Sequence, residues 1–480
     1  MENQNNVYTL DEALSEVGFG NFQSLALVFA GVGWFSEAME MNLLSFIGPA
    51  VKSEWSLSPT EESLLSTAVF AGMLIGAYFW GFLSDSYGRR MGLRCIAAVT
   101  VGAGFLSSFS PNYGSLLVLR CLLGFAVAGG HVFGSWLLEF IPSSNRGAWM
   151  LSLLIFWILG EVFEASIAWI IMPRLGWRWL LALSALPSLI ALVLSNFIPE
   201  SPRYLHMKGK TNETLRILEK IALINHKKLP TGCLVSDQEM VIDEDDSTSQ
   251  VTLLSSSIKK TTFLKSMFEL LSSDLRGTTL LLWILHFTFT FAYYGVVLMT
   301  SALSSGSNEC ASKTNNLEVS KDATLYVSVF IACLAEFPGF LIATVLVDRI
   351  GRKLTMEILT IFGLILILPL ASHQNQVVTT ALLFGTRMFL FAAFSTLTIY
   401  AKEVYPTCVR ASGSGLATSM GRIGGMICPL VAVGLVRGCH QTAAVVMFGI
   451  VIVISGICVL FFKFETKGRG LSDNIVSTAQ

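Results

Sequence analysis

Long apolar stretches dominate the chain. An α-helix needs about twenty residues to cross roughly 30 Å of hydrocarbon, and apolar runs of about that length recur along the sequence. They lie near residues 24–48, 61–84, 92–110, 114–138, 148–171, 178–197, 277–302, 323–347, 354–372, 377–401, 412–435 and 441–463. The pattern predicts an all-α membrane protein with twelve transmembrane helices.

One sizeable polar segment interrupts this pattern, between the sixth and seventh runs. Its Thr211–Lys227 stretch is amphipathic and predicts a short helix on the membrane face. The acidic, Ser/Thr-bearing run around Asp237–Gln250 predicts a disordered linker. The predicted organisation is a tail (1–22), a six-helix bundle (23–197), a central loop (198–276), a second six-helix bundle (277–463) and a tail (464–480).

Charged residues repeat between the two halves at a nearly constant spacing. Five pairs are separated by 263 to 267 residues: Asp85 and Asp348, Arg120 and Arg387, Glu139 and Glu403, Arg146 and Arg410, Glu200 and Glu465. Repeats of six spans are typical of transporters that move two bundles around a central site. The spacing therefore predicts a duplicated carrier that works by alternating access.

Composition narrows the class further. The chain is 53% apolar and 14% charged, with a net charge of −1 and a mean hydropathy of +0.64, which indicates lipid as the main solvent. Because the Lys and Arg residues form only short clusters, no nucleic-acid partner is expected. The nine cysteines include no C-x-x-C pair, so we expect no metal and no cofactor. No nucleophile arrangement indicates an enzyme, and we expect a monomer whose partners are the bilayer and a small organic ion.

Loop charges predict the orientation. With a cytosolic N-terminus, the short inner connections and C-terminal tail hold twelve Lys and Arg, against six in the outer loops. Both termini are therefore predicted to be cytosolic, in the plasma membrane or the vacuolar membrane. Cys310 and Cys439 fall in predicted outer loops, where a disulfide between them is possible.

Several motifs carry a resemblance to a known family. The Gly81–Arg90 segment and its counterpart Val347–Lys353 resemble the signature loop of the major facilitator superfamily. Arg120-x-x-x-Gly124, Pro199–Arg203 and Glu465–Gly468 add to it. The resemblance implies the major facilitator fold. We expect a charge network that latches the cytosolic gate, formed by Asp85, Gly88, Arg89, Arg90, Glu139, Arg146, Asp348, Arg352, Glu403 and Arg410.

Within the superfamily, the chain resembles the branch of the synaptic vesicle glycoprotein and the nicotinate transporters, and is most similar to the plant organic cation/carnitine group. The segments that carry this resemblance are Val17–Gln23, Glu37–Phe46, Ala168–Trp169, Phe291–Gly295 and Gly421–Gly425. Organic anion and carnitine carriers of the wider family resemble this chain in placing Arg at the position of Arg422, where several organic cation carriers place Asp. The resemblance therefore implies a substrate with a carboxylate.

Ionisable groups inside the spans are functional candidates, because each costs about 2.5–3.5 kcal/mol to insert. Glu37 and Glu40 share one face of the first span. Burial disfavours the carboxylate anion, so either residue can take up a proton near neutral pH or simply bond a neighbouring helix. Glu336, beside Pro338 and Gly339, is either a further proton carrier or the partner of an arginine. The proton is the expected coupling ion.

The three arginines within spans need anionic partners. Arg120 and Arg387 occupy matching positions, which favours a structural role. Arg422 lies in a Gly-rich stretch, where its guanidinium either binds a substrate carboxylate or pairs with a helix. Glu161 and Glu164 are expected in the outer, wetter half of their span, as weaker cavity candidates.

Aromatic side chains provide faces for a heterocycle or a methylated nitrogen. The candidates are Trp169, Tyr293, Tyr294 and Phe394, and only one of the adjacent tyrosines is expected to point into the cavity. The leading hypothesis is a proton-coupled carrier of nicotinate, a methylated pyridine betaine or carnitine. The alternatives are an organic cation transporter and a non-transporting regulator or receptor of the same fold.

Overall fold

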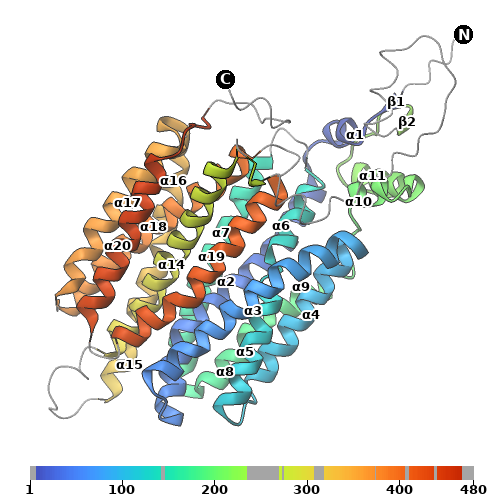
Figure 1. Ribbon diagram of the computed structural model, residues 1–480. Coiled ribbons are helices and arrows are strands. Elements are labelled where there is room, and N and C mark those ends of the chain that lie inside the picture. Colours follow the sequence, from blue (N-terminus) through green and yellow to red (C-terminus); the bar gives the residue numbers. More distant parts are fainter. Residues whose placement is uncertain are drawn as a thin grey trace, which may run out of the picture.

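Two bundles of long helices lie side by side, as Figure 1 shows for the computed structural model. The structure describes residues 7–141, 146–234, 270–272, 275–306, 318–372, 374–405, 410–436 and 440–467. The N-terminal bundle contains α2 (Asn21–Trp55), α3 (Pro59–Tyr87), α4 (Arg89–Ser107), α5 (Tyr113–Val127), α6 (Gly130–Leu138), α7 (Arg146–Leu175), α8 (Trp177–Ser184) and α9 (Leu186–Leu194). The C-terminal bundle contains α14 (Arg276–Gly306), α15 (Glu318–Leu334), α16 (Glu336–Ile350), α17 (Arg352–Ile367), η2 (Leu368–Ala371), α18 (Gln376–Val404), α19 (Arg410–Pro429), η3 (Leu430–Leu435) and α20 (Gln441–Leu460).

These helices agree with the twelve predicted spans. Among the described residues, ten helical segments are long and apolar enough to cross a membrane. Two more spans are less apolar. Helix α2 qualifies only together with α1 (Leu10–Val17), which is bent by 103° relative to it, and α4 carries three arginines within its 19 residues. Three of the spans are broken near their middle, at α5/α6, α8/α9 and α15/α16.

Glycines allow helices to pack closely inside the N-terminal bundle. Helices α3 and α5 face each other through Gly72, Gly76 and Gly124. A Cβ atom on any of the three would lie 2.0 Å from a backbone carbonyl oxygen of the facing helix. Small residues at such crossings are how helices associate tightly in lipid, where apolar surface alone gives no preference.

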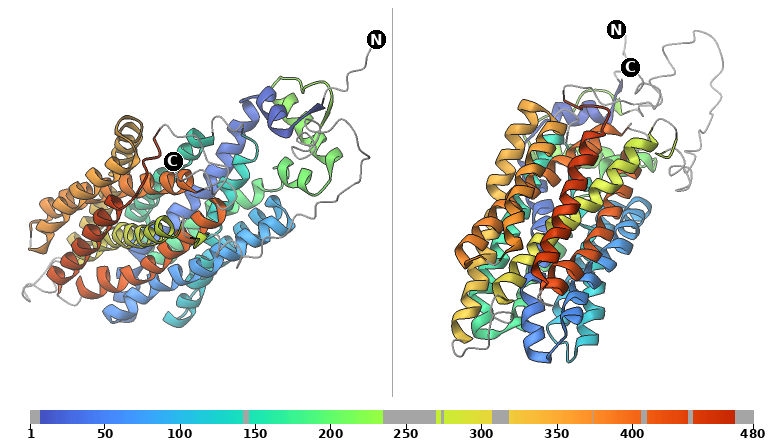
Figure 2. Two further views of the ribbon diagram at one scale, coloured as in Figure 1. Left: turned by 45° about the horizontal axis from the view of Figure 1, so that its top comes forward. Right: turned by 60° about the vertical axis from the view of Figure 1, so that its left-hand side comes forward.

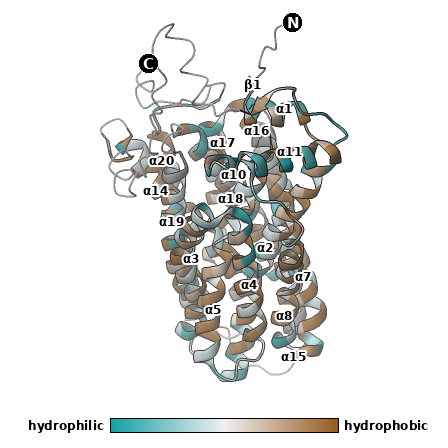
Figure 3. Ribbon diagram, turned by 90° about the vertical axis from the view of Figure 1, so that its right-hand side faces the viewer, coloured by the Kyte–Doolittle hydropathy of each residue, from teal (hydrophilic) through white to brown (hydrophobic). Residues whose placement is uncertain are grey.

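A small module lies beyond one end of the long helices, where Figure 2 shows the blue α1 near the green α10 (Pro202–Met207) and α11 (Thr211–Ile224). We call this the terminal end, and the opposite end the distal end. Strand β1 (Val7–Tyr8) pairs in parallel with β2 (Cys233–Leu234). The hydropathy colouring of Figure 3 shows many hydrophilic residues at the terminal end, around α10 and α11.

Helix α11 forms where the amphipathic pattern predicts it, but its packing differs from the prediction. Leu218 and Ile221 on its apolar face are fully buried, and Leu218 packs with Tyr8, Leu10 and Leu14 of the N-terminal segment. Protein therefore covers a face that was expected to lie on lipid. The predicted linker around Asp237–Gln250 lies outside the described residues.

The two bundles meet differently at their two ends. Toward the distal end, Ala165 and Ala168 of α7 pack in one apolar cluster with Leu325 and Tyr326 of α15. Toward the terminal end, a cleft between the bundles is lined by Leu154 of α7 and by α16 and α18 residues that include Asp348 and Ser395. The structure is therefore closed at the distal end.

Candidate substrate and proton-coupling site

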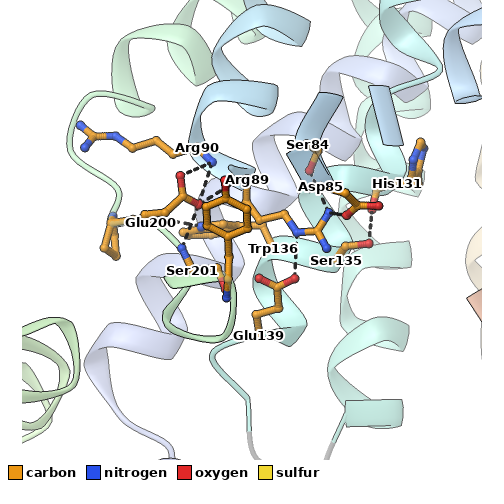
Figure 4. Close-up of polar contacts among 12 residues, drawn as sticks. Ser84, Asp85, Arg89, Arg90, His131, Ser135, Trp136, Glu139, Glu200 and Ser201 are labelled. Atoms are coloured by element: carbon orange, nitrogen blue, oxygen red, sulfur yellow. Dashed lines mark hydrogen bonds and ion pairs between the residues drawn. The ribbon is translucent and has the colours of Figure 1, made fainter. Parts of the chain in front are cut away.

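The turn between α3 and α4 gathers the first set of predicted latch residues (Figure 4). Gly88 has a φ of +105°, a conformation that residues with a Cβ rarely adopt. Arg89 Nε donates to Glu139 Oε1 at 2.8 Å, and Nη1 donates to Ser84 Oγ at 2.9 Å. The same guanidinium lies 2.5 Å from the carboxylate of Asp85. Burial raises the pKa of Glu139, although the charge of Arg89 opposes that shift.

Glu200, which follows the last span of the N-terminal bundle in the chain, caps the first turn of α4. Its carboxylate accepts the backbone N–H of Arg89 at 2.8 Å and that of Arg90 at 3.2 Å. A Cβ atom at Gly88 would lie 2.5 Å from Glu200 Oε2. An acid at a helix N-terminus satisfies free N–H groups and the helix dipole, so glycine and glutamate together fix this turn.

The C-terminal half repeats this arrangement. Gly351 has a φ of +92°, and Glu465 accepts the backbone N–H groups of Arg352 and Lys353, both at 2.9 Å. Arg352 pairs with Glu403 at 2.7 Å. Although burial alone would raise it, the backbone hydrogen bonds hold the pKa of Glu465 below its usual value. The nearly constant spacing between the halves therefore reflects one arrangement that is built twice.

The described contacts of the predicted latch stay within each bundle. Asp85 pairs with Arg89 of the adjoining turn, and its side chain is 66% exposed. Asp348 is exposed and lines the cleft between the bundles. The side chains of Arg146 and Arg410 lie outside the described residues, as do Cys310 and Cys439. A latch that joins the two bundles stays a prediction.

A buried ion pair lies in the middle of the N-terminal bundle. Arg120 Nη1 of α5 lies 3.2 Å from Glu40 Oε2 of α2, and both side chains are 1% exposed. Glu40, a predicted proton carrier, is thus the partner of Arg120. The carboxylate of Glu164 on α7 also attracts the Arg120 guanidinium electrostatically. It accepts a hydrogen bond from the Ser184 hydroxyl at 3.0 Å.

A second buried cluster surrounds Arg387 of α18. Its Nε and Nη2 lie 3.0 and 2.9 Å from Glu336 Oε1 of α16, and Nη2 also bonds Glu161 Oε2 of α7. The Tyr293 hydroxyl of α14 lies 3.1 Å from Glu161 Oε1 and also bonds Glu336 Oε1. Because α7 belongs to the other bundle, this cluster joins the two halves.

Sequence reasoning underestimated Glu161. Glu161 and Glu164 were expected in the outer half of their span, within reach of water, but they are only 2% and 0% exposed. The expectation failed because the burial of α7 depends on helices distant in sequence. The sequence signal that pointed to these contacts is the spacing of three residues, which places both carboxyl groups on one face of α7. One helix can then supply an acid to Arg387 and another to Arg120.

Arg422 of α19 occupies a third position, again between the bundles. Its Nη2 lies 3.9 Å from Glu37 Oε1 of α2, with the two side chains 15% and 12% exposed. Nη1 contacts Met73 Sδ at 3.7 Å, and the Tyr294 hydroxyl also contacts the guanidinium. Nε has no hydrogen-bond partner among the described residues. Judged by distance and exposure, the pairing of Arg422 is looser than that of Arg120, which lies 3.2 Å from Glu40, or of Arg387, which lies 2.9 Å from Glu336.

Of the four predicted aromatic residues, three lie around these central groups. Tyr294 packs edge-on against Phe70 at 4.9 Å, and Tyr293 stacks on Phe394 at 6.1 Å. Both tyrosines are buried, one contacting Arg422 and the other the Arg387 cluster. Trp169 is 44% exposed and lies 6.1 Å from the ring of Phe330, so the structure does not bring it to the central site.

Two six-span bundles with charged pairs buried between them define a multi-pass membrane transporter. The profile of the family described as "Sugar (and other) transporter" matches residues 38–474. The chain therefore belongs to this family, and it has the major facilitator fold. Both findings agree with the predicted transporter and with the prediction that the protein is not an enzyme.

Individual relatives agree with this assignment. The chain is 51% identical to the Arabidopsis thaliana protein "Organic cation/carnitine transporter 7", over 100% of this chain and 99% of that protein. It is 35% identical to the Xenopus laevis "Synaptic vesicle 2-related protein", over 97% of this chain and 83% of that protein. Among solved structures, the partially occluded inward-open xylose transporter XylE of E. coli superposes with a TM-score of 0.70 at 18% identity, covering 95% of this chain and 100% of that one. The predicted fold class and branch are confirmed.

Proposed function

We propose that this protein is a proton-coupled carrier of a small organic ion with a carboxylate, such as nicotinate, a methylated pyridine betaine or carnitine. The observation that carries the proposal is the incomplete pairing of Arg422. Its guanidinium lies between the bundles, 3.9 Å from Glu37, and the side chain is 15% exposed, whereas those of Arg120 and Arg387 are at most 1% exposed. A planar guanidinium with free donors favours a carboxylate ligand in a bidentate geometry.

Glu37 supplies the link to the proton. When a substrate carboxylate occupies Arg422, Glu37 loses its counter-charge in a largely buried position, and uptake of a proton removes the uncompensated anion. Glu37 is held close to α6, since a Cβ atom at Gly130 would lie 1.7 Å from Glu37 Oε2. Substrate and proton would then bind together. Glu40 and Glu336 stay predicted proton carriers.

The name of the Arabidopsis relative mentions both organic cations and carnitine, so an organic cation is the second candidate substrate. The buried acids that would attract a cation mostly pair with arginines here: Glu40 with Arg120, and Glu161 and Glu336 with Arg387. This favours a substrate whose anionic end matches Arg422. A methylated nitrogen at the other end of the substrate would make a cation–π contact with the ring of Tyr294 or Phe70.

The test compares Arg422→Lys with the wild type. Lysine keeps the charge but loses the fork, and a charge-assisted hydrogen bond contributes about 1.5–3 kcal/mol, so carboxylate affinity should fall about ten- to hundredfold. Competition against radiolabelled nicotinate uptake by unlabelled nicotinate, carnitine and tetraethylammonium measures this. Arg276→Lys, at the exposed start of α14, is the matched control. Equal losses for tetraethylammonium and the carboxylates would contradict recognition by Arg422.

A further inference from the structure

The cluster around Arg387 holds one more carboxyl group than it has positive charges. Arg387 and Glu336 are 0% exposed, and Glu161 is 2% exposed. If both carboxyls were ionised, the cluster would bury a net negative charge without solvent, which is a costly arrangement. Two carboxyls that share one site commonly resolve this by keeping a single proton between them.

The hydrogen bonds of Tyr293 indicate the same proton independently. Its hydroxyl contacts Oε1 of both Glu161 and Glu336. A tyrosine hydroxyl carries one hydrogen, so it can donate to only one of the two carboxyls. The other contact is a hydrogen bond only if that carboxyl is protonated and donates to the hydroxyl oxygen. The geometry thus fits one carboxylate and one carboxylic acid.

Within the part of the chain that the structure describes, the elements around Glu161 supply no other compensating charge. It faces Arg387 from α18, Glu336 from α16, Tyr293 and Tyr294 from α14, and Cys333 from α15. Helix α2 contributes the neutral Asn42, whose amide donates to the Glu161 carbonyl at 2.9 Å. On α7 itself, Trp157 Nε1 donates a hydrogen bond to Glu161 Oε1 at 3.1 Å. The other acid of this helix, Glu164, interacts electrostatically with Arg120.

The position of the cluster links its proton to the movement of the bundles. Glu161 belongs to the N-terminal bundle, whereas Arg387, Glu336 and Tyr293 belong to the C-terminal bundle. Opening the distal end parts α7 from α15 and α18, and so separates Glu161 from Arg387. If Glu161 left as an anion, it would leave an unpaired carboxylate in one bundle and a surplus positive charge in the other. If it leaves protonated, Glu336 and Arg387 remain as a neutral pair.

We propose that Glu161 and Glu336 share one proton when the bundles are closed at the distal end, and that Glu161 carries this proton away when they part. Tyr293 provides the path. It donates its hydrogen to Glu161 while accepting that of Glu336, so one proton moves from Glu336 to Glu161 and the tyrosine is unchanged. Once exposed to distal water, Glu161 exchanges the proton, and the bundles close again only with Glu161 protonated.

This inference deepens the proposed coupling and rests on the carrier cycle, but its test needs no substrate. Spin labels on non-natural amino acids at Pro111 and at Val377, which is 78% exposed, report the distal separation of the bundles and leave the native cysteines in place. In the wild type, the closed fraction should rise as pH falls from 8 to 5, with the closed-to-open ratio changing by up to about tenfold per pH unit for one coupled proton.

Three variants give distinct results. Glu161→Gln should close at every pH and lose the pH dependence, because Glu336 alone then neutralises Arg387. Glu336→Gln should favour the closed state and should open its distal end less often than the wild type. In this variant, separation of the two bundles leaves Arg387 without an anionic partner. Glu357→Gln, which removes a partly buried carboxyl of α17 near Gly456, should behave as the wild type. A wild-type pH response in Glu161→Gln would overturn the proposal.

Infrared spectroscopy detects the proton itself. At neutral pH the wild type should show a carboxylic-acid carbonyl band that is lost in both Glu161→Gln and Glu336→Gln, and persistence of the full band in both would contradict a shared proton. If neither variant folds, Tyr293→Phe decides: it should shift this band, and an unshifted band would overturn the inference. Arg422→Lys should keep the pH-dependent distance, so failure of substrate recognition is separable from failure of this proposal.

Discussion

The buried pair of Glu40 and Arg120 gives a stability prediction with a definite size. Glu40→Gln leaves the Arg120 guanidinium, 1% exposed, without the carboxylate that lies 3.2 Å away. Breaking a buried ion pair by removing one partner costs about 3–5 kcal/mol, mainly because the remaining charge stays desolvated. Arg120 Nε and Nη2 have no hydrogen-bond partner in the described ranges of the chain, so no neutral contact there compensates for the loss.

Removing both charges should cost much less. Arg120→Met combined with Glu40→Gln eliminates the isolated cation, and such replacements are often close to neutral. The difference between the single and double variants is the coupling energy of the pair. As a control, Glu213→Gln removes the exposed ion pair with Lys210 at 3.0 Å, which should cost under about 1 kcal/mol.

Reversible unfolding in mixed detergent and SDS measures these free energies. The carboxylate of Glu164 also acts on Arg120 and could take over as its partner. The double variant Glu40→Gln/Glu164→Gln closes that route and should show the full loss. If this variant and Glu40→Gln both stay within about 1 kcal/mol of the wild type, the unpaired charge of Arg120 does not destabilise the fold as expected.

Two further predictions concern other parts of the fold. Because the folded pKa of Glu465 is lowered, its stabilising effect is present above the unfolded value near 4.3 and is lost as pH falls through the folded pKa. Glu465→Gln should therefore lower the thermal midpoint at pH 7 but not well below pH 4; an equal decrease at both would contradict the capping role. Gly124→Leu should destabilise the protein by more than about 3 kcal/mol, because a Cβ atom there lies 2.0 Å from the Val69 carbonyl oxygen. At Gly102 an added Cβ atom would meet no described residue within 4 Å, so Gly102→Ala should change the unfolding free energy by less than about 1 kcal/mol. Similar losses in both variants would exclude close packing as the cause.

The layout of the fold follows from local rules that the sequence displays directly. Apolar length predicts the spans because hydrocarbon thickness sets it, and the helices α2 to α20 lie close to the predicted ranges. The repeated Gly-Arg turns and acids mark equivalent positions in each half. The capping role of Glu200 and Glu465 was not predicted, since each is about 110 residues from the helix that it caps.

The partners of the buried charges depend on packing between distant helices. Glu161 bonds Arg387 across 226 residues and two bundles, and no periodicity in one helix specifies that contact. Glu37 and Glu40 also look equivalent in sequence, being three residues apart on one face. The structure distinguishes the two residues by their partners. Glu40 pairs with Arg120 of the same bundle, whereas Glu37 pairs with Arg422 of the other bundle. The packing of the N-terminal segment against α11 also joins residues that are distant in sequence.

Counterflow in proteoliposomes shows whether the protein is a carrier of organic carboxylates, because exchange of labelled for unlabelled substrate needs only an intact translocation cycle. We expect wild-type protein loaded with nicotinate or carnitine to accumulate the labelled compound, and Arg422→Lys to need about ten- to hundredfold more substrate for the same exchange. Tetraethylammonium should drive little exchange in either protein. Exchange of tetraethylammonium alone would indicate a cation carrier, and no exchange of any compound would indicate a non-transporting regulator; either result would contradict transport of an organic carboxylate by this protein.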